Sequence, residues 1–191
     1  MSELVQSVCL AIVQGLTEFL PVSSSAHLIL VPKLLGWPDQ GLFFDVAVHF
    51  GTLMAVLFYF RLEIRHMLID CLKWCFGHGT TPYTKLAFMI GLATIPVCIV
   101  GLILHDSISS IMRSMTVIAY ATIFFGVILY LSDKFSKTDG HQVGLGKSLC
   151  IGLSQVLSLI PGTSRSGITL TAGLALGLSR QAAARFSFLL A

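Results

Sequence analysis

A polar loop with an arginine at its centre interrupts an apolar part of the chain. The loop reads Pro161-Gly162-Thr163-Ser164-Arg165-Ser166-Gly167 and has apolar runs on both sides. An arginine at membrane depth is costly unless it meets an anion or a water-filled cavity, so it indicates a functional site. The planar guanidinium of Arg165 matches the geometry of a phosphate group. The loop therefore predicts a phosphate-binding site.

The neighbours of Arg165 strengthen this prediction. Further hydrogen-bond donors are the hydroxyl groups of Ser164, Ser166, Thr163 and Thr169. Gly162 lets the backbone approach a ligand closely, and a helix beginning near Gly167 would direct the positive end of its dipole at an anion. A structural alternative is a helix break in which Arg165 forms an ion pair with Glu18. Such a pair needs excellent geometry to offset its desolvation.

A second polar stretch, residues 14–27, also lies between apolar runs. Gln14 and Glu18 are spaced to share one helix face, and their oxygens suit a divalent cation such as Mg²⁺ or Ca²⁺. His27 can act as an acid or a base near neutral pH, or accept a phosphoryl group itself. The nucleophile stays open between Ser24, His27 and a water molecule activated by His27; we favour Ser24. The other histidines are interpreted as structural: His49, His66, His78, His105 and His141.

The composition identifies the class of protein. Of the 191 residues, 55% are hydrophobic and 11% are charged, whereas about a quarter are charged in soluble proteins. The chain is therefore predicted to be an integral membrane protein. The sequence contains no Walker loop and no nucleic-acid-binding module, so we expect no nucleic-acid partner.

The apolar runs predict an all-α helical bundle in a single transmembrane domain, residues 1–191. Full spans are expected at residues 43–60, 86–104 and 115–131, and an amphipathic helix at 63–76. Two further elements, at about 4–36 and 149–178, are each broken by a proline into halves shorter than the roughly 20 residues of a span. Such broken elements are typical of re-entrant helices that line a cavity. The last residues resemble the start of another span, so we expect C-terminal helices to be missing.

Basic residues predict the orientation. The segments 61–85 and 132–147 are rich in arginine and lysine, whereas the turn between them, 105–113, holds only Arg113. By the positive-inside rule the two basic segments are cytoplasmic. The first broken element then enters from outside and the second from the cytoplasm, so we expect two inverted repeats whose tips meet near the bilayer midplane.

The two polar stretches together resemble the signature motifs of the bacterial undecaprenyl pyrophosphate phosphatase family, also called bacitracin resistance proteins. The similar residues are Gln14-x-x-x-Glu18, the Phe-Leu-Pro-Val-Ser-Ser run through His27, and Pro161-Gly-Thr-Ser-Arg165-Ser-Gly-Ile-Thr169. The similarity extends along the whole chain. Gln14 stands where many members of the family have a glutamate, which removes one candidate metal ligand.

The resemblance implies hydrolysis of undecaprenyl diphosphate to the monophosphate lipid carrier. This reaction supports peptidoglycan synthesis, cell-wall biogenesis and cell shape, and confers bacitracin resistance. The resemblance also implies a multi-pass protein of the bacterial inner membrane, with a site that opens to the periplasmic face and a divalent metal. Its implied catalytic residues are Glu18, Ser24, His27 and Arg165, supported by Ser23, Ser164 and Thr169. The expected partners are the prenyl diphosphate lipid and membrane lipids, and a homodimer is left open.

A membrane transporter or flippase for a phosphorylated lipid or anion is the alternative function. Inverted repeats around an anion site at the midplane are also typical of transporters. Release of inorganic phosphate from a prenyl diphosphate distinguishes the enzyme from the transporter.

Overall fold

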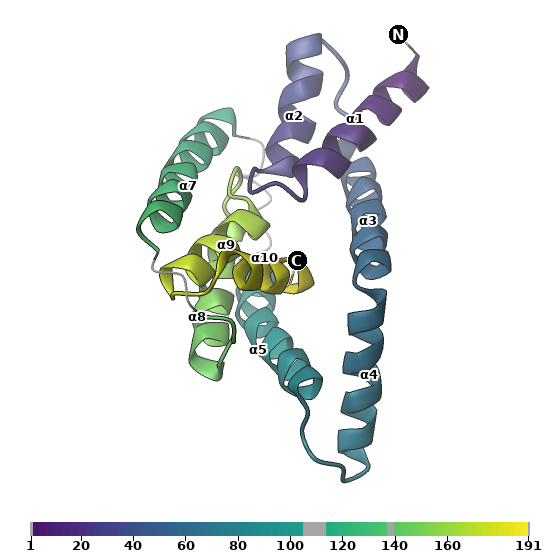
Figure 1. Ribbon diagram of the computed structural model, residues 1–191. Coiled ribbons are helices and arrows are strands. Elements are labelled where there is room, and N and C mark those ends of the chain that lie inside the picture. The colour runs from purple at the N-terminus through teal and green to yellow at the C-terminus, as the bar shows by residue number, and fades with distance from the viewer. Residues whose placement is uncertain (1, 105–113, 137–139, 191) are drawn as a thin grey trace.

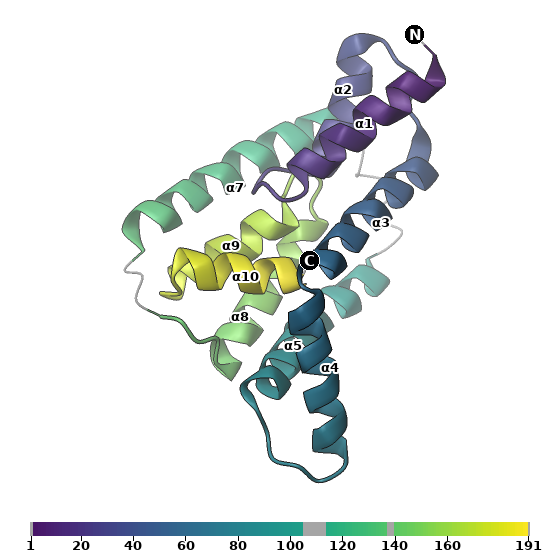
Figure 2. The same cartoon turned by 45° about the vertical axis from the view of Figure 1, so that its right-hand side comes forward.

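The computed structural model describes residues 2–104, 114–136 and 140–190, and most of these lie in helices (Figures 1 and 2). The helices are α1 (Glu3–Thr17), α2 (Ser24–Leu35), α3 (Gly41–Tyr59), α4 (Arg61–Cys75), α5 (Pro82–Ile103), α7 (Met115–Phe135), α8 (Leu145–Gln155), α9 (Arg165–Ala175) and α10 (Arg180–Leu190). A 3₁₀ turn, η1 (Val156–Leu159), follows α8. The all-α prediction is confirmed for the described residues.

Two helix hairpins, α1–α2 and α8–α9, approach each other from opposite directions, and their turns meet near the middle of the molecule (Figure 1). The turns lie where the sequence placed its two proline breaks. The Ser166 hydroxyl of the second turn donates a hydrogen bond to the Leu20 carbonyl of the first, at 3.3 Å. Segments about 150 residues apart in the chain are thus joined at a single place.

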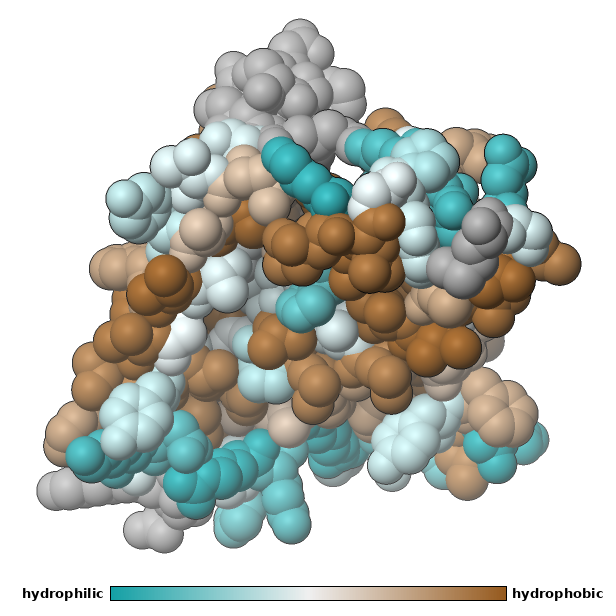
Figure 3. All heavy atoms as spheres, turned by 90° about the horizontal axis from the view of Figure 1, so that it is seen from above, coloured by the Kyte–Doolittle hydropathy of each residue, from teal (hydrophilic) through white to brown (hydrophobic). Residues whose placement is uncertain are grey.

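Helices α3, α5 and α7 are long and apolar enough to cross a membrane, which confirms the three predicted spans. Their outer faces carry exposed large apolar side chains, among them Phe43, Phe50 and Tyr120. Hydrophobic side chains also cover much of the surface seen from above (Figure 3). Apolar surface of this extent is typical of helices that face lipid.

The remaining predicted segments match with small shifts. The amphipathic segment 63–76 forms α4, and Thr81 caps the start of α5 in a reciprocal capping box. The predicted end of the third span at residue 131 is too early, because α7 continues to Phe135. Asp133 in this last turn accepts a hydrogen bond from Arg180 of α10 at 2.6 Å, which helps to hold the extension. The predicted turn at 105–113 lies outside the described residues.

The core lies where α8, α9 and α10 pack on α5. Its buried apolar side chains include Ala93, Ile151, Leu174 and Phe186. Gly152 of α8 lies so close to Ala93 of α5 that a Cβ atom there would be 2.5 Å from the Ala93 carbonyl oxygen. The second hairpin is therefore fixed against α5 by direct backbone contact.

Helix α7 fixes the turn of the second hairpin. Gly162 has a φ of +90°, and its α-carbon faces the backbone of Ile118 so closely that a Cβ atom would be 2.5 Å from the Ile118 carbonyl oxygen. Thr122 of α7 donates a hydrogen bond to the Gly162 carbonyl at 3.0 Å. Only glycine adopts this conformation and this approach without strain.

Candidate active site

The carboxylate of Glu18 lies at the turn of the first hairpin, immediately after the last residue of α1. Its Oε2 atom accepts a hydrogen bond from Gln14 Nε2 at 2.8 Å and another from Ser24 Oγ at 2.5 Å. The predicted shared face of Gln14 and Glu18 is therefore observed. Gln14 is fully buried, so it holds the carboxylate from inside the bundle.

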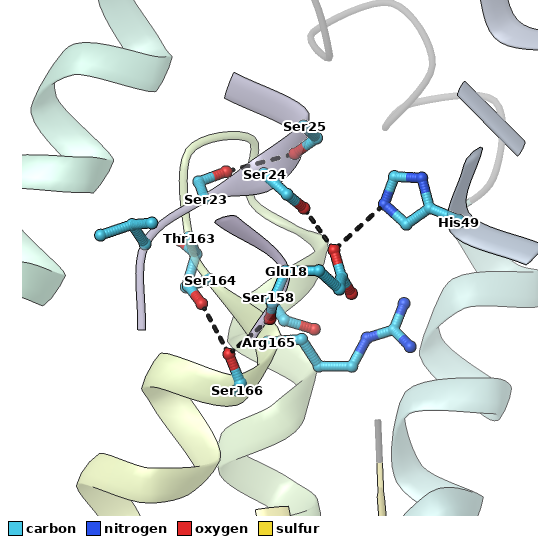
Figure 4. A pocket seen from close by; sticks show the side chains of 11 residues that line it. Glu18, Ser23, Ser24, Ser25, His49, Ser158, Thr163, Ser164, Arg165 and Ser166 are labelled. Carbon is cyan, nitrogen blue, oxygen red and sulfur yellow. Dashed lines mark hydrogen bonds and ion pairs between the residues drawn. The ribbon is translucent and has the colours of Figure 1, made fainter. Parts of the chain in front are cut away.

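Ser23 and Ser24 occupy the start of α2 and have different tasks. Ser23 caps the helix, because its hydroxyl accepts a hydrogen bond from the Ala26 N–H at 3.3 Å. The hydroxyl of Ser24 instead points to Glu18 (Figure 4). A carboxylate that accepts a hydrogen bond from a hydroxyl can also accept its proton, which is the arrangement of a base beside a nucleophile.

His27 lies one turn further along α2, where its Nδ1 atom is 2.7 Å from the Ser23 carbonyl oxygen. The ring is half-buried and is not among the residues that line the cavity around Ser24. The structure therefore pairs Ser24 with Glu18 and places His27 against the backbone.

His49 of α3 lies at the site, so its interpretation as a structural residue is revised. Its Nε2 atom is 3.6 Å from Glu18 Oε2. The spacing of polar residues in this span already indicates a polar helix face that includes His49. Polar residues occur at 45, 49 and 52 of an apolar span, a spacing that places Asp45, His49 and Thr52 on one helix face. Among the other histidines assigned as structural, His105 lies outside the described residues.

The second turn contributes Arg165, the first residue of α9. Ser164 caps this helix by accepting a hydrogen bond from the Gly167 N–H at 3.1 Å. The helix therefore begins at Arg165, two residues before the predicted start, because the Ser164 cap satisfies its first turn. The Arg165 side chain lies beside Glu18 and extends towards α3 (Figure 4).

The hydroxyl groups of the second turn differ in their use. Thr169 is buried and hydrogen-bonds the Ser187 hydroxyl of α10 at 2.6 Å. Ser164 and Ser166 line the cavity but also bond each other at 3.1 Å. Thr163 lines the same cavity, and its buried hydroxyl has no hydrogen-bond partner among the described residues. Buried polar groups are rarely left unsatisfied, so the Thr163 hydroxyl is available to a water molecule or a ligand.

Two adjoining cavities meet at Glu18, His49 and Arg165. The first, of about 80 Å³, is polar and is lined by both turns, with Ser158 of η1 as a further hydroxyl that the sequence did not single out. The second, of about 300 Å³, is mostly apolar and is lined chiefly by α3. Its apolar side chains are Phe19, Val46, Phe50, Leu53, Val56 and Phe188. A polar group with an apolar tail fits this combination.

The described residues hold no group of three or more His, Cys, Asp or Glu side chains that could bind a metal ion by themselves. Glu18 and Gln14 are the predicted ligands, and the buried Gln14 Oε1 atom has no hydrogen-bond partner in the part of the chain that the structure describes. Mg²⁺ is commonly held by one or two carboxylates together with substrate phosphates. Glu18 lines both cavities and fits a cation whose remaining ligands come from a substrate, whereas Gln14 lines neither cavity and its amide donates to Glu18.

The sequence is similar to those of known proteins. The sequence model of the family described as "Bacitracin resistance protein BacA" matches residues 7–191. The undecaprenyl-diphosphatase of Thioalkalivibrio sulfidiphilus is 56% identical over 190 residues, which cover 98% of this chain and 71% of that protein. The undecaprenyl-diphosphatase of Hahella chejuensis is 55% identical over 184 residues, covering 96% and 69%. Undecaprenyl-diphosphatase 2 of Stutzerimonas stutzeri is 55% identical over 193 residues, covering 98% and 72%. The chain belongs to the bacitracin resistance protein BacA family.

Proposed function

We propose that this membrane protein is an undecaprenyl-diphosphatase, which hydrolyses undecaprenyl diphosphate to undecaprenyl phosphate and inorganic phosphate. One observation carries the proposal: the Ser24–Glu18 pair faces a polar cavity that continues into an apolar one. The function named for its relatives requires both a phosphate site and a place for a prenyl chain. The role in bacitracin resistance follows from the family.

In this proposal the diphosphate binds between the two turns. Arg165 binds phosphate oxygens through its planar fork, and the Thr163 hydroxyl gains the partner that it lacks. The first turn of α9 adds the positive end of a helix dipole. The prenyl chain lies in the apolar cavity along α3, with Phe19 and Phe188 beside it.

The proposed reaction has two steps. First, Glu18 takes the proton of Ser24, and Ser24 Oγ bonds to the terminal phosphorus. The bond from this phosphorus to the bridging oxygen breaks, and its electron pair leaves with undecaprenyl phosphate. Second, water attacks the phosphoserine, Glu18 returns its proton to Ser24 Oγ, and the phosphate leaves with the protons of the water. Arg165 and Thr163 stabilise the charge on the transferred group in both steps, which is the main way that proteins catalyse phosphoryl transfer.

A divalent cation, Mg²⁺ or Ca²⁺, belongs to the proposal and would be held by Glu18 and the substrate phosphates, with Gln14 as the second predicted ligand. When bound, it neutralises charge on the diphosphate. Treatment with a chelator is expected to lower activity and addition of Mg²⁺ or Ca²⁺ to restore it. Activity that persists fully after exhaustive chelation would remove the cation from the mechanism.

The membrane arrangement extends the proposal. The two opposed hairpins are proposed as inverted re-entrant elements at about 4–36 and 149–178, within one transmembrane domain of the bacterial inner membrane. The site then opens towards the periplasm. A cysteine placed near Asp39 is expected to react with an impermeant reagent in intact cells, and one near Thr138 only after permeabilisation. The homodimer stays a prediction.

The decisive test is release of inorganic phosphate from a long-chain prenyl diphosphate by the purified protein in detergent. The proposal expects stoichiometric phosphate and prenyl monophosphate. Binding or translocation of the lipid without phosphate release would favour the transporter instead. Rapid quenching with substrate labelled in its terminal phosphate tests the nucleophile, because phosphoserine survives acid whereas phosphohistidine does not. Label that is lost in acid would replace Ser24 with His27, and turnover without label would favour water.

A further inference from the structure

His49 belongs to α3, outside the two hairpins that carry the family motifs. Its ring is held in a defined orientation, because Nδ1 is 2.7 Å from the Asp45 carbonyl oxygen one turn earlier in the helix. The Thr52 hydroxyl donates a hydrogen bond to the His49 carbonyl at 2.8 Å. The side chain is 36% exposed and lines both cavities.

The hydrogen bond of Nδ1 determines what the other ring nitrogen can do. A carbonyl oxygen can only accept, so Nδ1 carries the hydrogen of this bond. Nε2 is then the atom that faces Glu18, at 3.6 Å from Oε2 (Figure 4). An attractive contact of Nε2 with this carboxylate requires the imidazolium form, in which both ring nitrogens carry a hydrogen. This separation is longer than a direct hydrogen bond and lies within the distance of an ion pair.

Three helices converge on the same carboxylate oxygen. Gln14 of α1 and Ser24 of α2 donate hydrogen bonds to Glu18 Oε2, and His49 approaches it from α3. Gln14 lies within the same hairpin as the carboxylate, whereas His49 lies on a separate transmembrane helix. His49 therefore connects the position of α3, and with it the wall of the apolar cavity, to the proposed base.

We propose that His49 is a positioning residue, which acts through Glu18 to hold the carboxylate facing Ser24 Oγ. This inference rests on the proposed function. It assigns the imidazole no bond to the substrate and no role as nucleophile. Because the effect is on the attack by Ser24, removal of His49 lowers kcat and leaves KM nearly unchanged.

The test compares three variants of the full chain in the phosphate-release assay. His49→Leu keeps a side chain suited to an apolar helix but removes the contact with Glu18. Its kcat is expected to fall about 10- to 100-fold, the equivalent of one hydrogen bond to a charged group. His49→Gln places an amide nitrogen near the position of Nε2, and its kcat is expected to lie within about threefold of wild type. His66→Leu is the matched control, because His66 stacks on Tyr83 away from the site.

Each outcome bears on the inference. Loss of kcat in His49→Leu, rescue by His49→Gln and normal His66→Leu activity support it. Wild-type kcat in His49→Leu overturns it, and so does a rise in KM alone, which would make His49 a substrate contact. Equal loss in His49→Gln and His49→Leu also overturns it, provided that both variants unfold at the wild-type temperature. If wild type and His66→Leu release no phosphate, the proposed function fails and this inference fails with it.

Discussion

The two turns that meet at the centre of the molecule have different tasks. The first turn presents a carboxylate and a hydroxyl, Glu18 and Ser24, to the polar cavity. In the second turn, Gly162 packs on α7 and Thr169 bonds α10, while Arg165 and Thr163 face the cavity. One turn carries the proposed covalent chemistry, and the other, which is firmly anchored, is the proposed anion site. Two hairpins that meet at one place thus need not share one function.

Removal of the reactive pair in the first turn is expected to have the largest effect. Glu18→Gln removes the base and Ser24→Ala the nucleophile, and each is expected to lower kcat by about a thousandfold or more. Because the two residues act as a unit, the double variant loses little more than either single variant. All three variants are compared by phosphate release. If the fold loss of kcat in the double variant equals the product of the two single losses, Glu18 and Ser24 act separately.

Replacement of the anion-binding group in the second turn is expected to have the next largest effect. Arg165→Ala is expected to abolish measurable turnover, and Arg165→Lys to remain about a hundredfold below wild type, because an ammonium group cannot reproduce the planar fork. The assay compares both variants with wild type at matched protein concentration. Near-complete rescue by lysine would indicate that positive charge alone is required.

The close packing of the second turn on α7 predicts that a larger side chain at position 162 lowers the stability of the protein. Gly162→Ala introduces a Cβ atom against the Ile118 backbone at a φ of +90°, and it is expected to destabilise the protein by about 2 kcal/mol. Gly15→Ala is the control in the first hairpin, where a Cβ atom has nothing within 4 Å. Thermal unfolding in detergent measures both. Equal unfolding temperatures for the two variants would contradict the difference in anchoring.

Two threonines of the second hairpin provide the finest comparison. Thr163→Val removes the hydroxyl without a partner and is expected to lower kcat/KM about tenfold with unchanged stability. Thr169→Val breaks the buried bond to Ser187 and is expected to cost about 1–2 kcal/mol of stability with little change in kcat. Phosphate release and thermal unfolding are measured for each. A reversal of the two patterns would exchange the roles assigned to these residues.

Much of the architecture could be predicted from local sequence. The proline breaks, the apolar spans and the face shared by Gln14 and Glu18 depend on residues close together in the chain, and all are observed. The arrangement of the site depends on how the helices pack against one another, which could not be predicted from local sequence. The proximity of His49 to Glu18 arises from the packing of α3 beside α1, and the pairing of Thr169 with Ser187 from the packing of α10.

The type of a residue was therefore a weaker guide to its role than the hydrogen-bond partners of its side chain. The sequence treated Gly162, Thr169 and Ser164 as parts of the phosphate site, but a glycine can serve a ligand or a neighbouring helix equally well. In the structure Gly162 faces α7, and Thr169 has its hydroxyl in a buried network. Ser164 lines the cavity and also caps α9. Which hydroxyl is left for a ligand becomes clear only when the other bonds are known.

The apolar cavity along α3 has a consequence for how rates are measured. Its walls include Val46 and Phe50, whose side chains are largely exposed on a helix suited to span a membrane. A substrate that enters there is captured by diffusion within the lipid layer. Turnover is then expected to follow the mole fraction of substrate in the micelle or bilayer, so that added inert detergent slows the enzyme by surface dilution at constant bulk concentration.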